Sequence, residues 1–362
     1  FLFQPSLCVN NDDTESFLER FNGISWEVEN SDDGFRLIDS DEVLMFSSGT
    51  SFYNTAVTDQ ALSDEEELTG YDGYRWSPDS DAIAFWEEDE SKVPEYSIVN
   101  ELGLYPKVKK IRYPKVGQVN PSLRIGIARV KGAGKRWIRD ALTEDNYLPW
   151  MEWIDTEKIS FLKMNRKQNH WDLFVANKNT GKSIKVLSEN DTGGWLDNDG
   201  EIYFLKDGKI IWISEQSGFK HIWLSKHSGT KKWAITKGNW EVSEIKYIDE
   251  EAQKIYFIAN QKSIFEQNLF SIRFDGTEMR ILTHESGVHR IEITNDKKYF
   301  IDYFSSLITP PKIVLKELKT GKVLRILKET DILQYTDYEW STPKIVHFPS
   351  KDGQVQLDGI II

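Results

Sequence analysis

The acidic run Asp64–Glu67 is the segment whose residue types are best suited to chemistry. It places four carboxylates side by side, and such an arrangement repels itself unless water or a cation compensates the charge. A protonated amine is a suitable cation, because an ammonium group donates hydrogen bonds that carboxylate oxygens accept. The run therefore indicates a docking point for a free amino group, and the alternative is a solvated acidic loop.

The elements around this run are predicted to be short strands. Tyr71–Asp79, directly downstream, is strand-like and ends in a turn. The clearest hairpin joins Ile202–Leu205 to Ile210–Ile213, because Asp207 and Gly208 between them supply the positive φ that a tight turn needs. The same strand–turn–strand pattern recurs at 171–187, 221–236, 268–283 and 313–327.

The spacing of these hairpins predicts the fold. Their ends, at Leu187, Thr236, Thr283 and Leu327, lie roughly 45 to 50 residues apart, which is the period of a four-stranded propeller blade. The sequence therefore predicts an all-β protein, a β-propeller of about seven to eight four-stranded blades. A sandwich or a barrel is the alternative.

The first blade is the least regular. Gly23–Trp26 and Val43–Phe46 are strand-like, whereas Asn30–Asp33 and Asp39–Glu42 are acidic and loop-like. We therefore expect a propeller that is open or incomplete at its N-terminal edge.

Composition excludes several classes of protein. The formal charge of −13 and the pI near 5.1 argue against a nucleic-acid partner, which requires a basic face. No stretch approaches the ~20 apolar residues of a membrane-spanning helix. Cys8 is the single cysteine, so an internal disulfide is impossible. The chain begins without Met and is expected to be a fragment, which leaves targeting and membrane association open.

A family resemblance rests on several segments that occur in the same order. They include 65–79 (EEELTGYDGYRWSPD), 83–96, 105–121, 165–169, 214–221, 238–242 and 303–311 (YFSSLITPP). Together they resemble the N-terminal propeller of the dipeptidyl peptidase IV family, within the prolyl oligopeptidase superfamily of serine peptidases. The resemblance assigns 61–362 to this propeller and leaves 1–60 as a poorly matched N-terminal blade region.

The resemblance implies a role for the acidic run. In this family, two adjacent glutamates hold the protonated N-terminus of the substrate, and the spacing to Trp76–Pro78 places them at Glu66 and Glu67, preceded by the acidic Glu65. With the amine fixed, only the bond two residues along reaches the nucleophile. The chain has Ala61–Asp64 where the family commonly has an Asp-Trp pair and an aromatic residue, so the packing of this turn is expected to differ.

The implied function is that of a substrate-gating and N-terminus-anchoring propeller in a serine-type dipeptidyl aminopeptidase that releases Xaa-Pro or Xaa-Ala dipeptides. The sequence contains no Gly-x-Ser-x-Gly motif, so an α/β-hydrolase domain with the catalytic triad is expected after residue 362. The expected partners are peptides with a free N-terminus, that hydrolase domain and a second subunit. No cofactor is implied, and an extracytoplasmic location, periplasmic or at the cell surface, is expected.

The alternative function is that of an inactive relative or a free-standing propeller that serves as a protein-interaction module. The family's substrate-carbonyl arginine is not assigned to Arg20 or Arg36.

Other polar segments are predicted to be structural. His284 and His289 lie five positions apart, whereas the zinc motif His-Glu-x-x-His needs four, so we expect a turn between blades and no metal. Lys107–Tyr113 is predicted to be a solvated basic face, although the resemblance places a subunit-pairing extension nearby. Asn165, Arg166, Gln168 and Asn169 are predicted to form turn and inter-blade hydrogen bonds, with substrate contacts as the alternative. Trp195 and Trp240 are predicted to pack between blades. The alternative is that either lines the cavity that the resemblance implies between the propeller and the hydrolase domain.

Overall fold

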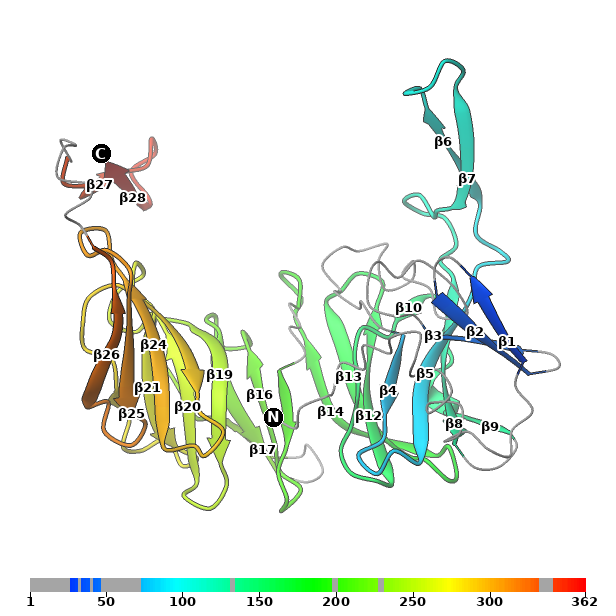
Figure 1. The fold of residues 1–362 in the computed structure, drawn as a ribbon, viewed down its shortest axis with the longest axis horizontal. Coiled ribbons are helices and arrows are strands. Elements are labelled where there is room, and N and C mark those ends of the chain that lie inside the picture. The colour runs from blue at the N-terminus through cyan, green and yellow to red at the C-terminus, as the bar shows by residue number, and fades with distance from the viewer. Residues whose placement is uncertain are drawn as a thin grey trace. The chain divides into compact units, whose positions relative to one another are not determined.

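The computed structural model describes residues 73–130, 134–196, 201–226, 231–331 and 341–362, together with the backbone of three earlier strands. The chain divides into two compact units, residues 1–200 and 201–362. Figure 1 shows that strands dominate both units. Each unit is described by itself.

The first unit opens with a three-stranded antiparallel sheet of β1 (Glu27–Ser31), β2 (Gly34–Asp39) and β3 (Glu42–Phe46). The strand predicted at Val43–Phe46 is confirmed within β3. The predictions that 30–33 and 39–42 are loop-like are wrong for Asn30, Ser31, Asp39 and Glu42, because these residues are paired in the β1–β2 and β2–β3 ladders.

Two larger sheets follow in the first unit. One has the order β4-β5-β8-β9 and comprises β4 (Tyr74–Trp76), β5 (Ala82–Asp89), β8 (Ser122–Arg129) and β9 (Lys135–Trp137). The other comprises β10 (Asn146–Tyr147), β11 (Met151–Trp153), β12 (Lys158–Asn165), β13 (His170–Asn177) and β14 (Ser183–Asn190). A short 3₁₀ helix at Arg139–Ala141 joins them.

A separate hairpin is inserted between β5 and β8. It consists of β6 (Glu95–Asn100) and β7 (Lys107–Arg112), which pair only with each other. Figure 1 shows this hairpin standing clear of the sheet from which it departs. It is therefore an appendage and not a blade strand.

The second unit contains three antiparallel four-stranded sheets whose strands follow one another in chain order. The first is β15 (Ile202–Phe204), β16 (Ile210–Ser214), β17 (His221–Ser225) and β18 (Lys232–Ala234). The second is β19 (Val242–Asp249), β20 (Lys254–Ala259), β21 (Asn268–Arg273) and β22 (Arg280–Ile281). The third is β23 (Val288–Ile293), β24 (Tyr299–Ser305), β25 (Lys312–Glu317) and β26 (Val323–Glu329).

These meanders are propeller blades, and all five hairpins predicted from the sequence are confirmed. The described residues supply four four-stranded sheets and one five-stranded sheet, and the total of about seven to eight blades stays a prediction. A final two-stranded hairpin is formed by β27 (Lys344–Pro349) and β28 (Gln356–Ile361).

Apolar side chains from adjacent sheets pack together to form the core. In the second unit, Phe257 of β20 stacks on Phe270 of β21 and on Trp240, with ring centroids 5.7 and 6.5 Å away. These rings belong to a buried cluster drawn from β16 to β21. A single blade has no partner for its second face, so the stacking of neighbouring blades is what buries these side chains.

In two consecutive blades, a threonine just after the fourth strand accepts a hydrogen bond from the backbone of the third strand. The Oγ1 of Thr236 accepts a hydrogen bond from the backbone N–H of Ile222 at 2.9 Å. In the next blade the Oγ1 of Thr283 accepts the equivalent bond from Leu269, also at 2.9 Å. These threonines are the ends of the hairpin repeat in the sequence, so the period has a local structural cause.

Glycines in the turns between third and fourth strands touch the preceding blade. Gly181, Gly276 and Gly321 have φ angles of +65°, +81° and +73°. A Cβ atom on Gly321 would lie 2.1 Å from the carbonyl oxygen of Leu282, and one on Gly276 would lie 3.0 Å from that of Ile235. Both the positive φ and the close approach therefore require glycine.

Candidate functional site

The predicted amine anchor, Glu65, Glu66 and Glu67, lies outside the described residues. The described residues resume directly before β4, the strand that follows the acidic run. The surroundings of β4 are therefore the portion of the predicted site whose contacts are known.

Strand β4 is attached to β11 by side-chain contacts. The Nε1 of Trp153 donates a hydrogen bond to the carbonyl of Arg75 at 2.9 Å. The Arg75 Nε lies 3.5 Å from a carboxylate oxygen of Glu152, and its guanidinium carbon lies 5.5 Å from the ring centroid of Trp86. These contacts hold β4 in place.

The Ser77–Asp79 turn closes β4 with hydrogen bonds. Ser77 Oγ donates to a carboxylate oxygen of Asp79 at 2.6 Å and accepts from the N–H of Ala82 at 3.0 Å. The hydrogen bond from Ser77 lowers the pKa of Asp79. The Ser-Pro-Asp sequence that carries the family resemblance therefore has a structural role in this turn.

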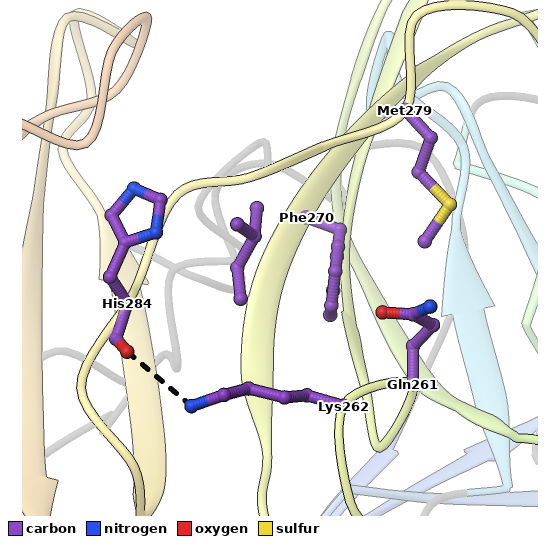
Figure 2. Close-up of a pocket in the computed structure, with 6 residues that line it drawn as sticks. Gln261, Lys262, Phe270, Met279 and His284 are labelled. Carbon is purple, nitrogen blue, oxygen red and sulfur yellow. Dashed lines mark hydrogen bonds between the residues drawn. The ribbon is translucent and has the colours of Figure 1, made fainter.

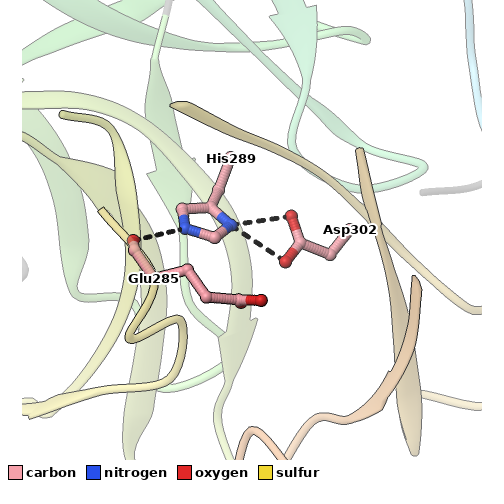
Figure 3. A group of neighbouring side chains, drawn as sticks. All are labelled: Glu285, His289 and Asp302. Atoms are coloured by element: carbon pink, nitrogen blue, oxygen red, sulfur yellow. Dashed lines mark hydrogen bonds and ion pairs between the residues drawn. The ribbon is translucent and has the colours of Figure 1, made fainter. Parts of the chain in front are cut away.

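A buried charge cluster lies in the second unit, and sequence reasoning missed most of it. Figure 3 shows Glu285, His289 and Asp302, from the β22–β23 connection, β23 and β24. The Nδ1 of His289 lies 2.9 Å from both carboxylate oxygens of Asp302, and its Nε2 lies 3.0 Å from the carbonyl oxygen of Glu285. His289 and Asp302 have fully buried side chains.

Two lysines of β25 complete this cluster. The Nζ of Lys316, whose side chain is 2% exposed, lies 2.8 Å from Asp302 Oδ2 and 2.9 Å from Glu285 Oε2. Lys312, nearer the surface, lies 2.8 Å from Glu285 Oε1. The five residues Glu285, His289, Asp302, Lys312 and Lys316 are called the charge cluster below.

Electrostatics favours the charged forms of two members of the cluster. Burial alone would raise the pKa of Glu285, but hydrogen bonds from Lys312 and Lys316 outweigh it and lower that pKa to about 2. Burial likewise opposes the charge of Lys316, yet the bonds to Asp302 and Glu285 raise its pKa. Glu285 and Lys316 are therefore both charged, and they form an ion pair at 2.9 Å.

The carboxylates and imidazole of this cluster could in principle ligate a metal, since their candidate ligand atoms lie within 4.8 Å of one another. The ammonium of Lys316 already contacts both carboxylates, which is the position that a cation would take. His284 is exposed, whereas His289 is buried, so the two histidines do not face a common centre. The segment between them connects β22 to β23, which confirms the predicted turn between blades.

A pocket of about 460 Å³ lies beside strands β21 and β22 (Figure 2). Phe270, Met279 and Ile281 form its apolar lining, and Gln261, Lys262 and His284 lie at its exposed side. The Nζ of Lys262 lies 2.9 Å from Ser286 Oγ and 3.0 Å from Glu266 Oε2. These contacts already engage the ammonium, so the pocket offers a ligand mainly apolar surface.

The remaining predicted segments have clear positions. Lys107–Arg112 forms β7, whose lysines are exposed. Asn165 Nδ2 donates to Asn169 Oδ1 at 2.8 Å, which confirms the predicted turn hydrogen bonds. Trp240 packs against Phe257 as predicted, but Trp195 is 70% exposed, so its predicted packing between blades is wrong.

The sequence offered one weak signal for the charge cluster. Lys316 follows the apolar residues Ile313–Leu315 of a predicted strand and lies two positions after the buried Val314, where the alternation calls for another inward apolar side chain. Its partners lie 14 and 31 positions away in the chain (316 − 302 and 316 − 285), and spacing patterns do not reveal pairings of that range.

Within the described residues of the chain, no helix has the length and apolar character needed to cross a membrane.

Known proteins resemble this chain in sequence and in structure. It is 28% identical over 305 residues to dipeptidyl peptidase 4 of Trichophyton equinum, which covers 79% of this chain and 39% of that protein. It is 31% identical over 307 residues to a probable dipeptidyl peptidase 4 of Aspergillus flavus, covering 78% of this chain and 39% of the relative. The chain thus spans about two fifths of the length of these relatives.

The fold is also that of a solved relative. The crystal structure of dipeptidyl peptidase 4 from Porphyromonas gingivalis aligns with a TM-score of 0.76 at 22% identity, covering 92% of this chain and 48% of that one. The profile of the family described as "Dipeptidyl peptidase IV (DPP IV) N-terminal region" matches residues 40–311. The chain therefore belongs to the dipeptidyl peptidase IV N-terminal region family and has its β-propeller fold.

Proposed function

We propose that this chain is the substrate-gating and N-terminus-anchoring propeller of a serine-type dipeptidyl aminopeptidase that releases Xaa-Pro or Xaa-Ala dipeptides. The family match, whose 272 residues from 40 to 311 include the acidic run, is the observation that carries the proposal. Glu66 and Glu67 hold the substrate ammonium, and Glu65 is the acidic position before them. The fixed attachment of β4 supports the proposal, because an anchor used to measure length must not move.

The chemistry of the proposed anchor is selective. A peptide ammonium offers three N–H donors and a full positive charge, whereas an acetylated or internal amide nitrogen is neutral. Paired carboxylates therefore favour free N-termini through charge-assisted hydrogen bonds. Because the amine is held at a fixed distance from the nucleophile, cleavage is confined to the second peptide bond.

The nucleophile is proposed to belong to an α/β-hydrolase domain after residue 362 and to act with this propeller. The relatives are more than twice as long as the matched region. The hairpin β27–β28 exposes apolar side chains, among them Phe348 (46%), Leu357 (42%) and Ile360 (49%). A second domain that packs on this hairpin would bury these side chains. For the location of the whole protein we propose an extracytoplasmic compartment, as the family resemblance implies.

The anchor is tested in the full-length protein by the double substitution Glu66→Gln with Glu67→Gln. Each charge-assisted bond contributes about 1.5–3 kcal/mol, so kcat/KM for a free-amine Xaa-Pro substrate should fall about 100-fold or more. Glu251→Gln, an exposed glutamate in the turn between β19 and β20, is the matched control and should keep wild-type kinetics.

Two results separate the alternatives. Unchanged kcat/KM in the double variant would refute the anchor while leaving the peptidase intact. Absence of any peptidase turnover by the wild-type full-length protein would instead favour the inactive relative, in which the propeller serves as an interaction module.

A further inference from the structure

The hydrogen-bond partners of His289 define the protonation of its ring. One ring nitrogen faces the Asp302 carboxylate at 2.9 Å and the other faces the Glu285 carbonyl at 3.0 Å. A carbonyl oxygen and an ionised carboxylate only accept hydrogen bonds, whereas a neutral imidazole has one N–H and one lone pair. A neutral ring would therefore direct a lone pair at an oxygen, and only a ring with two N–H groups satisfies both contacts.

His221 shows the contrasting case in the same unit. Its Nε2 lies 3.0 Å from the carbonyl oxygen of Gly238, and its Nδ1 lies 3.0 Å from Thr236 Oγ1. The threonine hydroxyl is able to donate a hydrogen bond. The neutral ring with its hydrogen on Nε2 therefore satisfies both contacts of His221, and no positive charge is needed.

The charges around His289 come from each element packed against it. Asp302 lies on β24, Glu285 on the β22–β23 connection, and Lys316 on β25 touches both carboxylates. Lys312 reaches Glu285 from the rim, where its side chain is 22% exposed. With a charged His289, the centre of the cluster holds a pair of cations and a pair of carboxylates, and Lys312 remains near solvent, where its charge costs little.

We propose that His289 is a buried imidazolium that closes an ionic latch between the β22–β23 connection and strands β24 and β25. Its N–H groups bond Asp302 on one side and the Glu285 backbone on the other, while the Glu285 side chain bonds both lysines. The ring of Phe304, with its centroid 4.7 Å from that of His289, covers the imidazole. The second unit thereby acquires an alkaline-sensitive contact between the β22–β23 connection and the blade that follows it.

The pH dependence follows from which form folding prefers. The latch stabilises the folded protein while the His289 ring holds both N–H groups, because a neutral ring would direct a lone pair at one of its two oxygen partners. Removal of His289 should therefore flatten the alkaline side of the stability profile.

The protonation state is measured directly on the wild-type full chain with isotope-labelled histidine. Nitrogen-detected NMR at about pH 8, above the ~6.5 of an ordinary histidine, should show one of the six histidines with both ring nitrogens protonated. If all six rings are neutral at that pH, the proposal is wrong, and this outcome does not depend on any variant folding.

The latch itself is tested by thermal unfolding between about pH 6 and about pH 10, a range that spans the ordinary histidine value. The wild-type Tm should fall as the pH rises. In His289→Gln the fall should be smaller, because one bound proton no longer contributes to the pH dependence of stability. His221→Gln is the matched control, because the contacts of this buried histidine need no positive charge, and it should keep the wild-type slope above about pH 8, well past the ~6.5 of an ordinary histidine. A wild-type slope in His289→Gln would overturn the proposal.

Discussion

A single buried charge requires several partners, and Lys316 shows which ones. Its ammonium reaches Asp302 and Glu285 from a strand whose neighbouring Val314 is buried. An isolated ammonium in this place would be expensive to desolvate. Sequence patterns alone did not predict the contacts of Lys316, because its partners come from a different strand and from a connection between blades.

Removal of Lys316 should be costly. In Lys316→Met two carboxylates lose their shared cation, and we expect the free energy of unfolding to fall by about 3–5 kcal/mol. Lys312→Met, at the rim of the same cluster, should cost less than about 1 kcal/mol. Urea unfolding of both variants measures the difference, and equal losses would show that Lys316 is not the central cation.

At the scale of elements, the hairpins were predictable from the sequence, but the threonine hydrogen bonds that end them were not. The strands of 202–213 are visible as two short apolar runs separated by a turn that contains Asp207 and Gly208, because a hairpin is a local structure. The hydrogen bonds that Thr236 and Thr283 accept join residues 14 positions apart. The sequence therefore shows the period of the repeat but not the hydrogen bonds at its ends. The detached β6–β7 pairing was predicted only as a long extension between strands.

The turn glycines provide a test at this scale. Gly321→Ala should lower the free energy of unfolding for two reasons. An alanine in the left-handed conformation costs about 1–2 kcal/mol, and the Cβ forced against Leu282 costs about 1–3 kcal/mol more. Gly218 has a φ of +95°, and no atom lies within 4 Å of the position that its Cβ would take, so Gly218→Ala isolates the backbone cost.

Denaturant unfolding should therefore find Gly321→Ala clearly less stable than Gly218→Ala. Gly276→Ala should fall between them, because its Cβ would lie 3.0 Å from the carbonyl oxygen of Ile235. If Gly218→Ala were as damaging as Gly321→Ala, contact with the preceding blade would not be the reason for glycine.

For the whole molecule, the fold class and the family were accessible from the sequence, because a repeat and a colinear set of motifs extend over most of the chain. The amine anchor remains a prediction, since Glu66 and Glu67 lie outside the described residues. The charge cluster could not be predicted from the sequence. Its residues come from three strands of one blade and from the connection before that blade, and they meet only in the folded protein.

The β6–β7 hairpin leads to a proposal about assembly. All six residues of β6 are exposed, and Val99 and Tyr105 are 51% and 78% exposed. Exposed apolar groups that gather on an appendage are typical of interaction surfaces, and we propose that this hairpin pairs two subunits.

Val99→Asp combined with Tyr105→Asp should convert a dimer of the full-length protein to a monomer in light scattering, without a change in Tm. Leu142→Asp, an equally exposed apolar position outside the hairpin (58%), is the control and should remain dimeric. A wild-type protein that is already monomeric, or a dimeric double variant, would contradict the proposal.

The glycine contacts also bear on the order in which the chain acquires its structure. Gly276 and Gly321 each rest on a carbonyl of the blade that precedes them in the chain. The surface that each turn needs is therefore synthesised before the turn itself. Because synthesis proceeds from the N-terminus, a growing propeller of this kind adds each blade to one whose docking surface is already available.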